Sequence, residues 1–275
     1  MIEIPEAIVL ATQLEKTIKE KTINNVIVGA SPHKFAFYHL NGEDYGKLLI
    51  GNKIMRSYPV AGRIEIELKD AYMSFNDGVN LRFYDENSEL PIKHQLFISF
   101  DDGSSLVATV SMYGGLFAYP SGAMDENMYY TVSKDAVSPL SDTFSFEYFK
   151  SLFDDKSIKM SAKAFLATKQ RIPGLGNGVL QDILLNARIH PKRKMNTLGN
   201  DEKMVLFDSI KSTLNEMVNL GGRDTEKDLY GNYGRYITKL SRNSLSLGCV
   251  NCKGEIRKEA YMGGSIYYCT NCQRL

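Results

Sequence analysis

The four cysteines of the chain lie within its last 27 residues, and their spacing is that of a metal site. They form two C-x2-C pairs separated by sixteen residues, Cys249 with Cys252 and Cys269 with Cys272. Each short turn brings two thiolates to one ion, and two turns complete the closed tetrahedron of a structural Zn²⁺ site. Four unrelated free thiols are the alternative interpretation. The spacing predicts one structural zinc, with residues 255–268 forming a β-hairpin between the two pairs.

A second candidate site is the glycine-rich stretch 171–177, which ends in Gly176 and Asn177. It precedes a predicted helix, and a helix N-terminus binds phosphate through its unpaired N–H groups and positive dipole end. Glycine lets a ligand approach the backbone closely. We expect Asn177 to cap the helix or to donate to a phosphate oxygen, with an ordinary turn as the alternative. The helix leads into the basic residues Lys192 and Arg193, preceded by His190, for which a packed or capping role is expected.

The charge of the chain is divided between its halves. Residues 1–150 carry 13 Lys and Arg against 20 Asp and Glu, a net −7, and the remainder carries 20 against 12, a net +8. A basic half favours a polyanionic partner, although a solvated basic face is the alternative. No apolar run reaches 18 residues and charges interrupt the N-terminal stretch, so we expect a cytoplasmic protein without a membrane span or signal peptide.

Hydrophobic periodicity predicts an α+β protein in which a β-rich part precedes a helical part. Pro5 fits the first turn of a helix that extends to about Lys21. Alternation over 63–68, and two runs at 95–100 and 106–110 joined by a turn, predict a mostly antiparallel sheet domain. Helices are expected over 161–169, 177–188 and 201–220, with Asp201 as the cap of the last and Gly221 at its end. The expected domains are 1–130, a linker at 131–150, a helical domain at 151–245 and a zinc finger at 246–275.

Three segments together resemble the formamidopyrimidine-DNA glycosylase/endonuclease VIII family. Residues 172–191 resemble its helix–two-turn–helix signature, residues 263–273 its zinc finger, and residues 3–6 its N-terminal motif. The resemblance implies an N-terminal β-sandwich with a leading helix, a helical DNA-binding domain with a zinc finger, and a monomer acting on duplex DNA that contains damaged bases or abasic sites. A damaged nucleotide would be extruded into a pocket, because a stacked base is out of reach of the protein.

The resemblance also assigns roles to individual residues. In the family an N-terminal amine attacks C1′ of the damaged nucleoside, and the resulting Schiff base leads to strand cleavage. Glu3 would manage protons at the sugar, Glu6 would support the site, and Arg63 stands where the family has a lysine near the lesion. Asn177 would hold a phosphate.

The sequence departs from the family at three further places. The usual N-terminal proline is replaced by Ile2, a bulky residue that disfavours removal of Met1. The attacking amine is then that of Ile2, that of Met1, or absent, in which case water attacks or the protein only binds DNA. The zinc-finger arginine is replaced by Gly264, so Arg257 or Lys258 is the candidate phosphate contact there, with two solvated residues as the alternative.

The residues that fill the vacated base stack are the third departure. Met112 and Tyr113 occupy the segment where the family places its wedge side chains, and they are expected to insert as apolar wedges or to pack in the β-domain core. Residues 223–242 interleave basic and aromatic side chains, where the family has a loop over the flipped base. The sequence therefore predicts a DNA base-excision glycosylase with altered lyase chemistry, with a non-catalytic binder of damaged DNA as the alternative.

Overall fold

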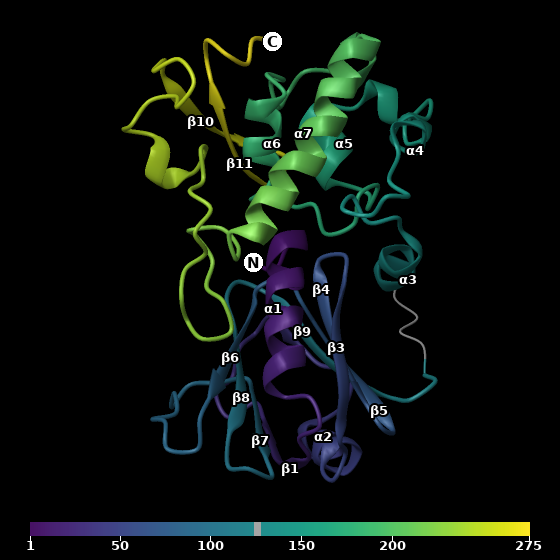
Figure 1. The fold of residues 1–275 in the computed structure, drawn as a ribbon, viewed down its shortest axis with the longest axis vertical. Coiled ribbons are helices and arrows are strands. Elements are labelled where there is room, and N and C mark those ends of the chain that lie inside the picture. The colour runs from purple at the N-terminus through teal and green to yellow at the C-terminus, as the bar shows by residue number, and fades with distance from the viewer. Residues whose placement is uncertain (124–127) are drawn as a thin grey trace. The chain divides into compact units, whose positions relative to one another are not determined.

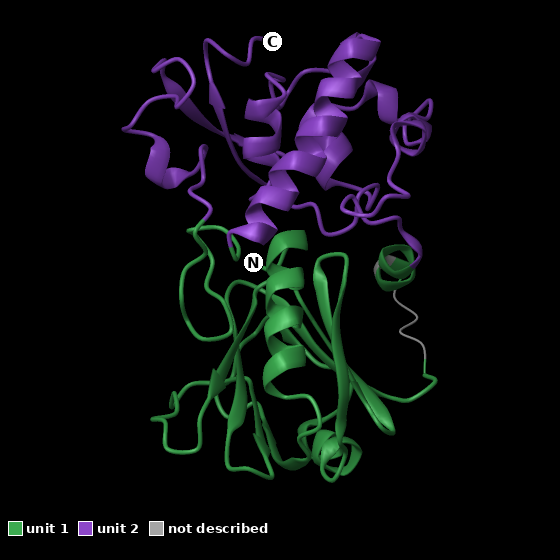
Figure 2. Cartoon of the chain, in the orientation of Figure 1, with its two compact units in different colours: residues 1–134, 221–235 green, residues 135–220, 236–275 purple. Residues whose placement is uncertain are grey.

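The computed structural model describes residues 1–123 and 128–275, and contacts divide these residues into two compact units. Unit 1 contains Met1–Lys134 and Gly221–Arg235, and unit 2 contains Asp135–Leu220 and Tyr236–Leu275 (Figure 2). Residues 124–127, part of the expected first domain, lie outside the described residues.

The second segment of unit 1 differs from the sequence expectation, which placed residues 221–235 in the helical domain. Side-chain contacts explain the difference. Gln13 Nε2 donates to Asp228 Oδ2 at 3.0 Å, and Leu229 is fully buried in the hydrophobic core of unit 1. The segment expected to be a linker at 131–150 carries the end of helix α3 (Met128–Asp135) and most of helix α4 (Phe146–Ser151).

Unit 1 is built from two sheets and a leading helix (Figure 1). The five-stranded sheet has the order β2-β9-β5-β4-β3 and the four-stranded sheet the order β1-β7-β8-β6. All neighbouring strands are antiparallel except β2 and β9. The elements are α1 (Ile4–Thr17), β1 (Ile23–Val28), β2 (Ala36–Phe37), α2 (Gly42–Leu49), β3 (Ile54–Val60), β4 (Arg63–Leu68), β5 (Ala71–Asn76), β6 (Val79–Tyr84), β7 (Leu96–Phe100), β8 (Ser105–Val110) and β9 (Gly114–Pro120).

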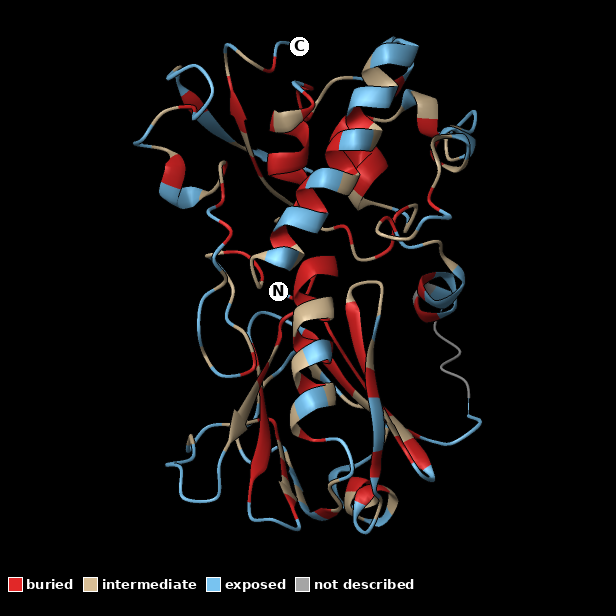
Figure 3. Cartoon of the chain, viewed as in Figure 1, coloured by how far each residue is buried: buried red, intermediate tan, exposed pale blue. Residues whose placement is uncertain are grey.

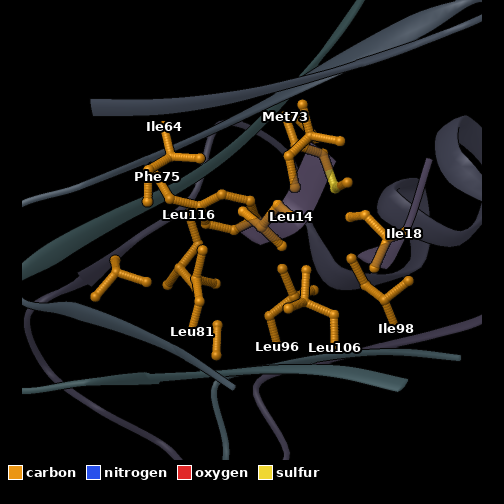
Figure 4. Packing of buried hydrophobic residues seen from close by; sticks show 14 of the residues in the cluster. Leu14, Ile18, Ile64, Met73, Phe75, Leu81, Leu96, Ile98, Leu106 and Leu116 are labelled. Carbon is orange, nitrogen blue, oxygen red and sulfur yellow. The ribbon is translucent and has the colours of Figure 1, made fainter. Parts of the chain in front are cut away.

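Helix α1 begins where the sequence signals predict. Glu3 is the N-cap residue and forms a capping box with Glu6, while Pro5 occupies the first turn. The apolar face of the helix packs against both sheets, and Figure 4 shows Leu14 and Ile18 among the core side chains. Because the core holds this face of α1 in place, the first residues of the chain have a fixed position in unit 1.

Unit 2 is helical and ends in a two-stranded hairpin. Its elements are α4, α5 (Ala162–Ala167), α6 (Leu180–Asn186), α7 (Asn200–Asn219), β10 (Ile256–Tyr261) and β11 (Gly264–Cys269). Helix α7 begins one residue before the predicted start, with Gly199 as its N-cap, so Asp201 lies in the first turn and is not the cap. The Glu202 carboxylate accepts a hydrogen bond from the Gly199 N–H at 3.0 Å, so the start of the helix is stabilised by Glu202 and not by Asp201. Figure 3 shows exposed and buried segments recurring along α7, because its buried residues recur every three to four positions and form one face of an amphipathic helix.

The predicted α+β fold class is confirmed, with a β-sandwich, a helical unit and a terminal hairpin. Among the described residues, none of the helices is both long and apolar enough to cross a membrane.

Candidate functional site

The first two backbone nitrogens of the chain have different environments in unit 1. The α-ammonium of Met1 lies 2.5 Å from Glu226 Oε2, and the Met1 side chain is 35% exposed. The Ile2 N–H instead donates to the carbonyl of Asp77 at 2.6 Å, and Ile2 is only 6% exposed. With Met1 present, the Ile2 nitrogen is therefore a hydrogen-bonded amide, and the free amine belongs to Met1.

Arg223 joins the two acidic residues that begin α1. Its Nε and Nη2 each donate to one carboxylate oxygen of Glu6 at 2.8 Å, and its Nη1 lies 3.7 Å from Glu3 Oε2. All three side chains are at most 6% exposed. The paired carboxylates raise the pKa of Arg223 despite its complete burial. Two buried carboxylates share one buried guanidinium, which fixes their geometry.

Arg63 lies at the start of β4 and is buried. Its guanidinium carbon lies 5.6 Å from the Tyr130 ring centroid, and its Nη1 has no hydrogen-bond partner within the described residues. Burial raises the pKa of Asp77, while the positive charges of Arg63 and of the chain's N-terminus oppose that rise. Asp77 therefore lies close enough to the N-terminal ammonium and to Arg63 for both positive charges to act on its carboxyl group.

The sequence patterns did not assign individual roles to Arg223, Glu226 or Asp77. Arg223 and Glu226 lie more than 200 residues from α1 along the chain, so no local pattern connects them with Glu6 or Met1. A cue was present at Gly221 and Gly222, since paired glycines before a charged residue are typical of a tight turn that presents a side chain.

Met112 and Tyr113 lie on the connection between β8 and β9, not in the core of unit 1. Met112 is 70% exposed and has a positive φ of 67°, and Tyr113 is 42% exposed. The β-domain core alternative from the sequence analysis is therefore wrong for both residues. Two exposed apolar side chains at a turn have the form that wedge residues require.

In unit 2, Asn177 binds the terminal hairpin. Its Nδ2 donates to the Ser265 carbonyl at 2.9 Å, and Val179 is the N-cap residue of α6, so the predicted capping role for Asn177 is wrong. The connection between α5 and α6 turns through three residues of positive φ, at Lys169, Gln170 and Gly174.

Gly176 belongs to the turn before α6, where its carbonyl accepts the Leu180 N–H at 3.3 Å. Lys163, which the sequence analysis missed, is 4% exposed and donates to the Tyr261 carbonyl at 2.5 Å. Its Nζ would lie 3.4 Å from a Cβ at Gly264, where the family has an arginine. The glycine thus leaves room for a lysine that comes from another element.

The basic residues predicted to contact DNA are ion-paired within unit 2. Lys192 pairs with Glu259, Arg193 with Glu202 at 2.5 Å, and Arg257 with Glu255 at 3.2 Å. His190 is 6% exposed, accepts the Lys192 N–H at 3.0 Å and packs edge-on against Tyr268. His190 therefore has the packed role that its sequence context predicts.

The four cysteines meet at the base of the hairpin. Their sulfur atoms all lie within 4.8 Å of one another, with Cys249 to Cys272 at 3.9 Å and Cys252 to Cys269 at 3.5 Å. Both separations exceed the roughly 2.05 Å of a disulfide. They match the spacing of about 3.8 Å that tetrahedral Zn–S bonds of about 2.3 Å impose. The backbone N–H of Gly254 lowers the pKa of Cys252 to about 7, which favours the thiolate that a metal requires. The cluster fits one metal ion.

The sequence of this chain matches a family model described as the formamidopyrimidine-DNA glycosylase H2TH domain over residues 136–228. Over its whole length it is similar to the formamidopyrimidine-DNA glycosylase of Cytobacillus firmus. The two are 28% identical over 282 residues, which cover 99% of this chain and 100% of that protein. The corresponding enzyme of Mycoplasma mobile is 27% identical, with both chains fully covered.

Solved structures show the same fold. A Lactococcus lactis Fpg in complex with abasic-site DNA superposes with a TM-score of 0.82 at 23% identity, covering 99% of this chain and 100% of that one. The same Fpg bound to FAPY-dG DNA also gives 0.82. A β-sandwich unit with a leading helix and a helical unit with a four-cysteine hairpin define the class of helix–two-turn–helix DNA glycosylase folds. Within that class, residues 136–228 of this chain match the formamidopyrimidine-DNA glycosylase H2TH domain, and the whole chain is similar to formamidopyrimidine-DNA glycosylases.

Proposed function

We propose that this chain is a DNA base-excision glycosylase that acts on oxidised or ring-opened bases in duplex DNA. The observation that carries the proposal is the arrangement at the start of α1. Two buried carboxylates, Glu3 and Glu6, share Arg223. Arg223 also lies 3.5 Å from the Met1 carbonyl oxygen, and the N-terminal ammonium of Met1 is exposed. Chemistry at a sugar C1′ needs a nucleophile and a group that moves protons, and this arrangement supplies both.

The remaining candidate residues take roles in binding DNA. Arg63 would place a positive charge near the lesion, and Gly176 and Asn177 would present donors to a phosphate. Met112 and Tyr113 would enter the base stack. Replacing both by alanine should weaken binding to a lesion duplex without changing the free energy of unfolding, because both are exposed.

The basic residues of unit 2 would bind phosphates after exchanging their present partners. The side chains of Lys192, Arg193 and Arg257 are between 23% and 56% exposed, and ion pairs at such positions contribute little. Exchanging a carboxylate for a phosphate therefore costs little.

The metal is proposed to be a single Zn²⁺ held by Cys249, Cys252, Cys269 and Cys272. A closed set of four thiolates leaves no open coordination position, so the ion stabilises the hairpin and takes no part in catalysis. Because its substrate would be duplex DNA, the protein is proposed to be cytoplasmic and to associate with the nucleoid when it binds DNA.

The test is release of free base. Purified protein is incubated with duplexes that each carry one oxidised or ring-opened base, and the released base is measured by chromatography. A Glu3→Gln variant should lose on the order of 100-fold in rate, the scale of a positioned acid–base group, provided thermal melting shows that it is folded. Absence of free base across the whole lesion panel would contradict the proposal.

A second candidate function is binding of damaged DNA without catalysis. One observation favours it, since the Ile2 nitrogen is a buried amide that donates to Asp77. This candidate predicts tight, lesion-specific binding by the wild-type protein together with zero base release.

A further inference from the structure

Three carboxylates and two cations converge around the first residue of the chain, and all belong to unit 1. The Met1 ammonium contacts Glu226, and Arg223 contacts Glu6 and lies 3.7 Å from Glu3. Glu226 Oε1 also lies 4.0 Å from Arg223 Nη2. Glu226 thus has one oxygen toward the amine and the other toward the guanidinium.

Arg223 contacts the Met1 carbonyl directly and the Met1 nitrogen through Glu226. Its Nη2 lies 3.5 Å from the Met1 carbonyl oxygen, and through Glu226 the same guanidinium is connected to the Met1 nitrogen. Because Arg223 is 3% exposed and bidentate on Glu6, it has little freedom to move. The position of the amine is therefore set by a buried group.

Backbone packing fixes the segment that carries Arg223 and Glu226. A Cβ at Gly234 would lie 2.1 Å from the carbonyl carbon and oxygen of Gly222 and 2.6 Å from the Arg223 nitrogen. Gly222 itself has a φ of +99°. Two backbone stretches can approach this closely only because residue 234 is glycine.

From these contacts we infer that the α-amine of retained Met1 is the attacking amine of this chain, that Glu226 accepts its proton, and that Arg223 positions the pair. The inference rests on the proposed glycosylase function and assigns its nucleophile. It selects one of the three alternatives that the sequence left open, because the Ile2 nitrogen is buried and hydrogen-bonded whereas the Met1 amine is exposed beside a carboxylate.

The chemistry is simplest on the aldehyde of an abasic deoxyribose. Glu226 takes a proton from the ammonium, and the freed nitrogen lone pair forms a bond to C1′. The aldehyde oxygen takes the proton from Glu226, which gives a carbinolamine. That hydroxyl then leaves as water together with a proton from the nitrogen, and C1′ and the Met1 nitrogen are joined as a protonated imine. A primary amine is sufficient for every step.

The experiment maps the nitrogen that becomes bonded to the sugar. Full-length protein is mixed with an abasic duplex and borohydride, which reduces the imine to a stable amine, and mass spectrometry of the N-terminal peptide locates the adduct. The expected result is intact Met1 carrying the deoxyribose. An adduct on Ile2, after loss of Met1, would overturn the inference and leave the glycosylase function standing.

Substitutions test the partner groups. Glu226→Gln should slow adduct formation on the order of 100-fold, the scale of a positioned base, whereas Glu43→Gln, which removes an equal charge from an exposed position of α2, should not change it. Arg223→Lys keeps the charge but loses the bidentate contact, so adduct formation at saturating DNA should fall while duplex affinity stays within about threefold. Equal adduct rates for Glu226→Gln and wild type would overturn the inference.

Removal of Met1 gives an independent test. Ile2→Ala permits cleavage of the initiator methionine and Ile2→Leu does not, which intact mass verifies. The leucine variant should carry its adduct on Met1, and the alanine variant should lose most of its adduct. With wild-type protein on a duplex that carries a ring-opened base, free base without any trapped adduct would overturn the inference alone, and the absence of both would overturn the glycosylase proposal as well.

Discussion

Arg223 and Glu6 are 217 residues apart in sequence and form a bidentate ion pair with both hydrogen bonds at 2.8 Å. Both side chains are almost completely buried, at 3% and 6% exposed. The pair attaches the segment Gly221–Arg235 to the first turn of α1 within unit 1. It therefore links the stability of the unit to the geometry of the candidate site.

Breaking this pair from one side should be costly. Arg223→Met leaves two carboxylates buried without their counter-ion, so the free energy of unfolding should fall by about 3–5 kcal/mol. Adding Glu6→Gln to that variant should recover part of the loss, since one uncompensated charge is removed. Urea denaturation of the four proteins of the cycle measures both effects, and strictly additive losses would show that the two residues are not coupled.

Glycine at position 234 should be required for the same geometry. Gly234→Ala places a methyl group against the Gly222 carbonyl, so the segment that carries Arg223 must shift. We expect a loss of stability of about 1–3 kcal/mol from overpacking, together with slower borohydride trapping on abasic DNA.

The matched control is Gly46→Ala in α2. A Cβ at that position would meet only the Ile50 side chain at 3.6 Å, an ordinary contact, and alanine favours a helix. If Gly234→Ala has the same melting temperature and the same rate of borohydride trapping as this control, the close backbone approach at Gly234 is not required for stability or for the reaction.

The sequence predicted local features of the chain well and distant pairings poorly. The start of α1 at Pro5, the strand at 63–68 and the cysteine hairpin each depend on residues close in sequence, whose spacing encodes the geometry. The contact of Arg223 with Glu6 depends on how the chain returns to unit 1 after α7, and no period encodes that. The capping role assigned to Asn177 was wrong for a related reason, because the Ser265 carbonyl binds its side chain instead.

Asp182 should make the stability of unit 2 depend on pH. Burial raises the pKa of this carboxyl to about 6, although the Lys239 and Leu240 N–H groups donate to it at 2.8 Å and oppose the rise. Between pH 3.8, the ordinary pKa of the Asp182 carboxyl, and about pH 6, this carboxyl is protonated in the folded state and ionised in the unfolded state. The contribution of Asp182 therefore favours folding at low pH and is lost as pH rises through that window, by up to roughly 1.4 kcal/mol per pH unit.

The measurement compares wild type with Asp182→Asn by denaturant unfolding from pH 4 to pH 7. Other carboxylates titrate in both proteins, including Asp102, whose pKa is lowered to about 2 by its hydrogen bonds from Lys21 and Ser104 against the effect of desolvation. The difference between the two curves isolates Asp182. Parallel curves through the window would show that its pKa is not raised.

Metal removal should unfold the terminal hairpin and leave unit 1 intact. The hydrophobic cluster beneath the hairpin is small and includes Cys249 and Cys269 themselves, so little apolar burial remains to hold β10 and β11 together without the ion. Chelation, or Cys272→Ser, should lower metal content from the proposed one zinc per chain toward zero and raise hydrogen exchange over Ile256–Cys269. DNA affinity should then fall, because the Ser265 carbonyl that binds Asn177 belongs to β11. Unchanged exchange in β10 and β11 after complete metal loss would contradict a structural role for the ion.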